Sequence, residues 1–167
     1  MGVTAENVAE RYGISRQEQD EFALESQSRA ARAIENGVFD EEIVPVEIIE
    51  KRNTFTFSKD EFPRPDTTIE KLAKLRPAFK ENGTVTAGNA CGRNDGAAAL
   101  VIMTAQKAQS LGVKPLARII DWTAAGVSPD IMGIGPVPAI EKLLRRTNKS
   151  LSEIGLIELN EAFAAQA

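Results

Sequence analysis

The last twelve residues place the strongest limit on what this chain can fold into. An apolar-polar alternation through residues 156–159 leads into Asn160 and Glu161, and an alanine-rich stretch follows at once. This pattern predicts a strand, then a polar corner, then a helix. Polar groups at strand-to-helix corners commonly form sites in α/β proteins. The sequence stops inside the expected helix without a capping glycine, so we expect a piece of a larger protein.

The composition is that of a globular protein and argues against several functional classes. Hydrophobic residues make up 43% of the 167 residues and charged residues 26%, enough for one core or parts of two. The net charge of -4 argues against nucleic acid as a partner. No apolar run approaches the ~20 residues that span a bilayer, so no membrane partner is expected. The single cysteine fits a reducing compartment, and we expect a cytoplasmic location.

The first 40 residues predict two helices. Thr4 is placed to cap a short helix that ends at Gly13. Ser15 and Glu18 have the spacing of a capping box, in which each residue bonds the other's backbone N–H. They open a long helix that is expected to run to about Glu35.

Strands and helices are expected to alternate along the rest of the chain. The expected strands are residues 42–49, 54–57, 83–86, 97–103, 115–123 and 156–159. The expected helices are residues 69–75, 105–111 and 139–147, with one capped turn at 150–153. Residues 97–103 form a continuous apolar run, which is typical of a strand buried on both faces. The pattern changes near residue 82, where we expect a domain boundary.

Cys91 is the first candidate for chemistry, because a cysteine thiolate can act as a nucleophile. The sequence contains no histidine to activate it, so an inert or merely binding thiol is the preferred interpretation. Residues 87–96 around it contain three glycines and could bring backbone close to a ligand. A simple turn between strands would need similar residues. The spacing matches neither the phosphate-loop nor the dinucleotide fingerprint.

Asn160 is the second candidate. A side-chain amide at a strand end can donate a hydrogen bond to a developing oxyanion, directly or through a water. Asparagine also caps helices well, and the pattern leaves both roles open.

Basic residues between positions 64 and 80 could meet a phosphorylated ligand or form an ordinary solvated face. The segment around Met132 could pack in a core or line a ligand channel.

Seven segments together resemble the thiolase family, and within it the acetyl-CoA acetyltransferase type. They are residues 1–10, 15–23, 74–79, 84–90, 94–99, 132–138 and 160–166. They keep the family's order, span nearly the whole chain and correspond to the middle of a family member.

The resemblance implies an α/β fold of two similar halves stacked in five layers, α/β/α/β/α, with a loop domain inserted in the first half. Residues 1–82 would form most of the loop domain. Residues 83–112 would complete the first half, and residues 113–167 would begin the second half.

The resemblance also implies a reaction, the reversible Claisen condensation of two acetyl-CoA molecules to acetoacetyl-CoA and CoA. CoA is substrate and product, and no cofactor is expected. In the family one cysteine carries the acyl group, a histidine activates it, and a second cysteine moves the α-proton. We expect these groups outside residues 1–167, so the chain alone should be inactive. The complete protein would be a dimer or tetramer.

To this chain the resemblance assigns an amide of the oxyanion hole and much of the CoA pocket, but no metal site. Asn160 matches the asparagine that fixes a water in that hole. The matched CoA-binding positions are Arg64 at the nucleotide end, Leu75 and Phe79 on the loop-domain wall, Ala87, Ala90 and Cys91 beside the pantetheine, and Met132, Ala162 and Phe163 near the thioester.

Two positions depart from the family pattern. Cys91 stands where the family usually has serine, which removes a hydroxyl contact to CoA and indicates a binding role. Lys71 stands where a smaller polar residue is usual.

The alternative to a thiolase that is catalytic when complete is a non-catalytic CoA-binding fragment, or one half of a split thiolase.

Overall fold

The computed structural model describes residues 1–51 and 53–167, and the chain divides into two compact units. Unit 1 comprises residues Met1–Gly92 together with Asn160–Ala167, and unit 2 comprises Arg93–Leu159. The last residues of the chain therefore fold with its first half. The domain boundaries expected at residues 82 and 112 refer to the complete family fold and stay predictions.

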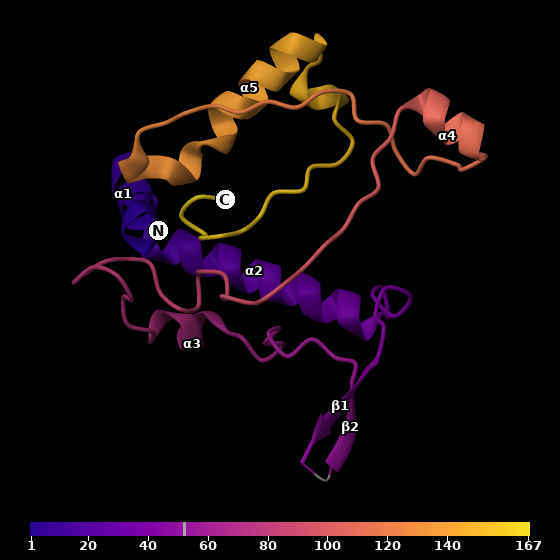
Figure 1. Ribbon diagram of the computed structural model, residues 1–167. Helices are drawn as coiled ribbons and strands as arrows, with labels where there is room; N and C mark the ends of the chain where they lie inside the picture. Colours follow the sequence, from indigo (N-terminus) through magenta and orange to yellow (C-terminus); the bar gives the residue numbers. More distant parts are fainter. Residues whose placement is uncertain (52) are drawn as a thin grey trace. The chain divides into compact units, whose positions relative to one another are not determined.

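Unit 1 begins with two helices (Figure 1). Helix α1, Gly2–Tyr12, ends at Gly13, whose φ of 69° is the left-handed conformation that glycine adopts without strain. Helix α2, Arg16–Glu35, begins at the predicted capping box of Ser15 and Glu18. The predicted cap by Thr4 is wrong. Met1 occupies the N-cap position, and the Thr4 hydroxyl donates to the Met1 carbonyl at 2.6 Å.

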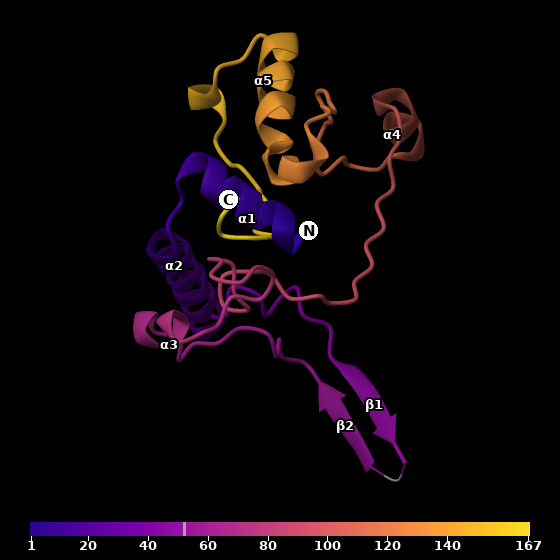
Figure 2. The same cartoon turned by 90° about the vertical axis from the view of Figure 1, so that its left-hand side faces the viewer.

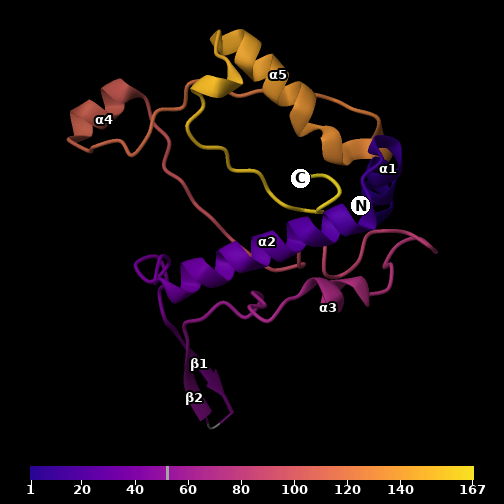
Figure 3. The ribbon, with the colours of Figure 1, turned by 180° about the vertical axis from the view of Figure 1, so that it is seen from behind.

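A hairpin and a short helix follow in unit 1 (Figure 2). Strands β1, Val46–Glu50, and β2, Asn53–Phe57, pair antiparallel, which confirms both expected strands with β1 starting just after Pro45. Proline lacks the N–H that a strand interior needs, so it stays outside the ladder. Helix α3, Ile69–Ala73, is capped by Thr68 as predicted and packs against α2 (Figure 3).

The core of unit 1 is small and contains polar as well as apolar side chains. Its buried apolar residues are Ala5, Val8, Ala9, Ala23, Leu72, Val85 and Ala165. Its buried polar residues are Glu6, Gln19, Asp20, Thr86 and Asn89. Since most of these apolar side chains are small, hydrogen bonds among the polar ones fix much of the arrangement.

Unit 2 contains the expected helices. Helix α4, Ala105–Leu111, ends at Gly112, and helix α5, Pro136–Thr147, begins three residues earlier than expected. Proline suits the first turn of a helix, where its missing N–H has no intrahelical partner. The 3₁₀ helices η1, Pro129–Ile134, and η2, Leu151–Glu153, complete the unit.

The remaining predicted strands are wrong for the described residues. Residues 83–86, 97–103, 115–123 and 156–159 lie in no strand and form no ladder. The side chains of Leu100 and Leu156 are 87% and 81% exposed. A buried parallel strand needs neighbouring strands and a covering layer of helices, and these segments have neither within the described residues.

The predicted helix after Glu161 is also wrong. Phe163 instead makes an isolated bridge with Ala90, and only a single turn follows it, closed by a hydrogen bond from the Gln166 N–H to the Phe163 carbonyl. Within the described part of the chain, no helix is long and apolar enough to cross a bilayer.

Candidate functional site

Two segments 70 residues apart in the sequence are joined in unit 1. The Cys91 N–H donates to the Ala162 carbonyl at 3.0 Å, and the Ala164 N–H donates to the Asn89 carbonyl at 2.9 Å. These bonds flank the antiparallel bridge between Ala90 and Phe163. Four of the predicted CoA-binding residues, Ala90, Cys91, Ala162 and Phe163, therefore lie side by side.

Two further predicted residues, Phe79 and Leu75, lie close to this junction. The ring of Phe79 meets that of Phe163 edge to face, with centroids 6.1 Å apart. Leu75 lies against Gly88, where an added Cβ would be 2.5 Å from side-chain carbons of both Leu72 and Leu75. Only glycine permits this approach, so Gly88 brings the loop against the leucines. Leu75 and Phe79 are each partly exposed.

The corner at Asn160 and Glu161 is attached to α2. The Ser26 hydroxyl donates to a Glu161 carboxylate oxygen at 2.6 Å. Asn160 is exposed rather than buried, and its side chain has no hydrogen bond to the described residues. The amide therefore does not cap a helix here and is open to a ligand or a water.

The remaining predicted site residues lie outside the Ala90–Phe163 junction. The backbone N–H of Arg64 donates to Gln27 of α2 at 2.8 Å, and its side chain is exposed. Ala87 is exposed on the same loop as Ala90. Met132 is exposed in η1 and belongs to unit 2. The structure thus brings most of the predicted residues of unit 1 together around the 90–163 bridge, whereas Arg64 is held at α2 and Met132 lies in the other unit.

Sequence reasoning missed a buried carboxylate below this loop. Glu6 of α1 is 3% exposed and accepts hydrogen bonds from the N–H groups of Thr84 and Val85 and from the Thr84 hydroxyl, at 2.8 to 3.0 Å. A Cβ on Gly83 would lie 2.2 Å from the Glu6 carboxylate, so glycine is needed there. The signal in the sequence was the position of Glu6 among the small apolar residues Ala5 and Ala9 on one helix.

A second buried carboxylate holds the loop from α2. One Asp20 oxygen accepts from the Asn89 side-chain amide at 2.9 Å, and the other accepts from Arg16 at 2.8 Å. The Asn89 side chain also accepts from the Thr86 N–H at 2.7 Å and donates to the Thr84 carbonyl. Residues 84–89 are thus fixed by side chains before they reach the junction at Ala90.

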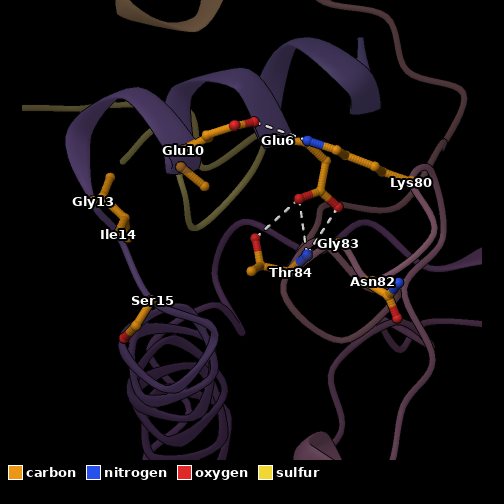
Figure 4. Close-up of a pocket in the computed structure, with 10 residues that line it drawn as sticks. Glu6, Glu10, Gly13, Ile14, Ser15, Lys80, Asn82, Gly83 and Thr84 are labelled. Carbon is orange, nitrogen blue, oxygen red and sulfur yellow. Dashed lines mark hydrogen bonds and ion pairs between the residues drawn. The ribbon is translucent and has the colours of Figure 1, made fainter.

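A pocket of about 350 Å³ lies between the end of α1, the start of α2 and residues 80–84 (Figure 4). At its rim the Lys80 ammonium donates to Glu10 at 2.8 Å. This hydrogen bond, together with the charge of Lys80, lowers the pKa of the Glu10 carboxyl below its ordinary value. Both side chains are exposed, so the pair is screened by solvent and adds little stability.

Comparison with protein families decides the identity of the fold. A family model described as "Thiolase, N-terminal domain" matches residues 1–106, and one described as "Thiolase, C-terminal domain" matches residues 113–167. The chain belongs to the thiolase family. The expected α/β thiolase fold is therefore confirmed. Solved structures match nearly the whole of this chain.

The similar thiolases and related acyltransferases are much longer than this chain. A probable acetyl-CoA acyltransferase of Staphylococcus epidermidis is 58% identical over the whole chain, which spans 43% of that protein. The acetyl-CoA acetyltransferase of Escherichia coli is also 58% identical, over 99% of the chain and 42% of its own length.

Among solved structures, the acetyl-CoA acetyltransferase of Bacillus anthracis matches with a TM-score of 0.93 at 58% identity, and human mitochondrial 3-ketoacyl-CoA thiolase with 0.91 at 48%. Each match covers 99% of this chain and 42% of the other chain. The chain therefore spans less than half the length of these relatives.

Cys91 does not have the surroundings of an activated nucleophile. Its side chain is exposed, and the chain has no histidine. Among the described residues of this thiolase chain, no group of three or more Cys, His, Asp or Glu side chains could hold a metal ion. What the junction offers chemically is hydrogen-bonding backbone, an apolar wall and an exposed amide.

Proposed function

We propose that this chain is the CoA-binding and oxyanion-stabilising part of a thiolase that condenses two acetyl-CoA molecules to acetoacetyl-CoA and CoA. The proposal rests chiefly on the junction of residues 89–91 with 162–164, which gathers most of the matched CoA-binding residues around one loop. The names of relatives 58% identical to this chain support the same chemistry.

In this proposal the matched residues contact different parts of the CoA molecule. The pantetheine arm of CoA lies along Ala87, Ala90 and Cys91, and the walls are Leu75 and Phe79. Arg64 meets the nucleotide end, where its charge complements phosphate. Ala162 and Phe163 lie beside the thioester. The apolar contacts exclude water and so strengthen electrostatic interactions at the reacting carbonyl.

Asn160 acts where charge develops. As the enolate of one acetyl group attacks the thioester carbonyl of the other, the carbonyl oxygen becomes an oxyanion. The Asn160 amide stabilises this oxygen through a held water and contributes more in the transition state than in the ground state.

The cysteine that carries the acyl group, the second cysteine and the histidine come from outside residues 1–167. We propose no cofactor, a cytoplasmic location and a homo-oligomeric complete protein.

The test is kinetic and uses the complete protein that contains this chain. Replacing Asn160 by alanine should lower kcat for acetoacetyl-CoA thiolysis by up to about 10²–10³-fold, the loss that follows removal of one direct oxyanion donor. The Kd for CoA should stay nearly unchanged, because the amide contacts a water rather than the coenzyme. Both quantities are measured on the same preparation, by steady-state assay and by calorimetry.

Two results would contradict the proposal. Equal losses in turnover and CoA affinity would mean that Asn160 supports the local fold and does not act in the reaction. Absence of thiolysis in the complete wild-type protein, with CoA still bound, would favour the non-catalytic CoA-binding alternative.

A further inference from the structure

We propose that helix α2 is the support that positions the Asn160 amide, with Ser26 and Asp20 as its two positioning residues. The inference rests on the proposed function, because it concerns the placement of the amide proposed to stabilise the oxyanion. Neither residue is among the predicted site residues, and neither would touch substrate.

The first attachment is direct. The Ser26 hydroxyl donates to Glu161 at 2.6 Å, and Glu161 is the residue next to Asn160. Ser26 is half-buried on α2, whereas Glu161 is exposed. Within the described residues the Asn160 side chain has no hydrogen bond of its own, so its position depends on the backbone that Glu161 holds.

The second attachment passes through the loop. Asp20 of α2, 2% exposed, accepts from the Asn89 side chain at 2.9 Å. The Asn89 carbonyl in turn accepts from the Ala164 N–H at 2.9 Å. Arg16 holds the second Asp20 oxygen at 2.8 Å, so the carboxylate cannot turn away without losing a charge-assisted bond.

Both attachments hold the chain directly after Asn160. Ser26 and Asp20 are six residues apart on one helix, roughly 9 Å along its axis. They hold the chain at residue 161 and residue 164, and this last segment runs beside α2 in unit 1 (Figures 1 and 3). A misplacement of about 1 Å at a reacting group can cost 10²-fold in rate, so loss of one attachment has a measurable effect.

The experiment compares two serines of α2 in the complete protein. Ser26→Ala removes the hydroxyl that holds Glu161, and Ser28→Ala makes the same chemical change two residues away. We expect S26A to lower kcat about tenfold, less than a full 1 Å misplacement, while KM and Tm stay near wild type. We expect S28A to leave kcat, KM and Tm unchanged. Ser26→Thr, which keeps the hydroxyl, should restore most of the lost turnover.

Hydrogen exchange of the peptide covering residues 157–167 provides a readout independent of activity. In S26A this peptide should exchange faster, and in S28A it should exchange as in wild type. If S26A leaves both its exchange and kcat unchanged, or if S26A and S28A lose kcat and Tm equally, the positioning role is wrong. If the wild-type protein lacks thiolysis, the proposed function fails, and the exchange of S26A still decides whether α2 holds the corner.

Discussion

Glu6 shows at the scale of one residue how a buried carboxylate can fix the shape of a loop. Its carboxylate is almost fully buried and accepts from two backbone N–H groups and one hydroxyl of the loop. These donors of the loop satisfy the hydrogen-bonding capacity of the carboxylate. Burying a carboxylate costs free energy unless hydrogen bonds or an opposite charge compensate it, and here hydrogen bonds do so.

Replacing Glu6 by alanine should therefore destabilise unit 1 strongly. The N–H group of Val85, which is fully buried, and that of Thr84, which is partly buried, would lose their acceptor, and a buried group left without one costs about 1–3 kcal/mol. We expect a loss of about 3 kcal/mol in the free energy of unfolding, measured by urea denaturation of the complete protein. The control is Glu10→Ala on the same helix, where the exposed ion pair with Lys80 is lost without a measurable change. Equal effects of the two substitutions would contradict the role given to Glu6.

The capping box is the clearest case at the scale of one element. The Ser15 N–H and hydroxyl both donate to Glu18 at 2.7 Å, and the Glu18 N–H donates back to the Ser15 oxygen at 3.2 Å. These bonds lower the pKa of the Glu18 carboxyl, with the backbone N–H of Ser15 as the main cause. A lowered pKa in the folded state means that ionised Glu18 favours the folded helix.

Replacing Ser15 by alanine should cost about 1 kcal/mol at neutral pH, the usual value for loss of an N-cap. The sign of the pH dependence follows from the lowered pKa. The contribution of ionised Glu18 is present above its unfolded-state pKa and is lost as the pH falls through the lower, folded-state pKa. Alanine keeps the backbone N–H of residue 15 and loses only the hydroxyl bond, so the stability difference between wild type and S15A should shrink by the hydroxyl's share in acid, as followed by thermal melts from pH 7 to pH 3. A difference that grows in acid would contradict this account.

Elements with a local signal were predictable from the sequence, and those that depend on distant partners were not. The caps at Ser15 and Thr68 and the glycine stop at Gly13 act within a few residues, so their helices formed where expected. The stretch after Glu161 has helical composition, but hydrogen bonds to residues 89–91 override it. The placement of Asp20 against Asn89 could not be read from either segment alone.

The same contrast holds for the whole molecule. The family resemblance assigned residues to a CoA pocket, and the structure brings most of those in unit 1 close together. The apolar runs predicted as strands form no strand within the described residues, with Leu100 and Leu156 mostly exposed. Strand pairing depends on segments that the sequence pattern of one strand does not specify.

These exposed runs lead to a prediction about the isolated 167-residue chain. Unpaired apolar strands are templates for pairing with other chains. We expect the isolated chain to self-associate, with sedimentation coefficients that rise with concentration. A monomer over the whole concentration range, with one cooperative melting transition, would contradict this expectation.

The central claim is that the junction of residues 89–91 with 162–164 forms the coenzyme site and that Asn160 faces the reacting carbonyl. A crystal structure of the complete protein soaked with acetyl-CoA tests it most directly. The account predicts pantetheine density along Ala87, Ala90 and Cys91, with the thioester near Phe163 and a water between its oxygen and Asn160. Acetyl-CoA bound away from both the 87–91 loop and the Asn160 corner would contradict it.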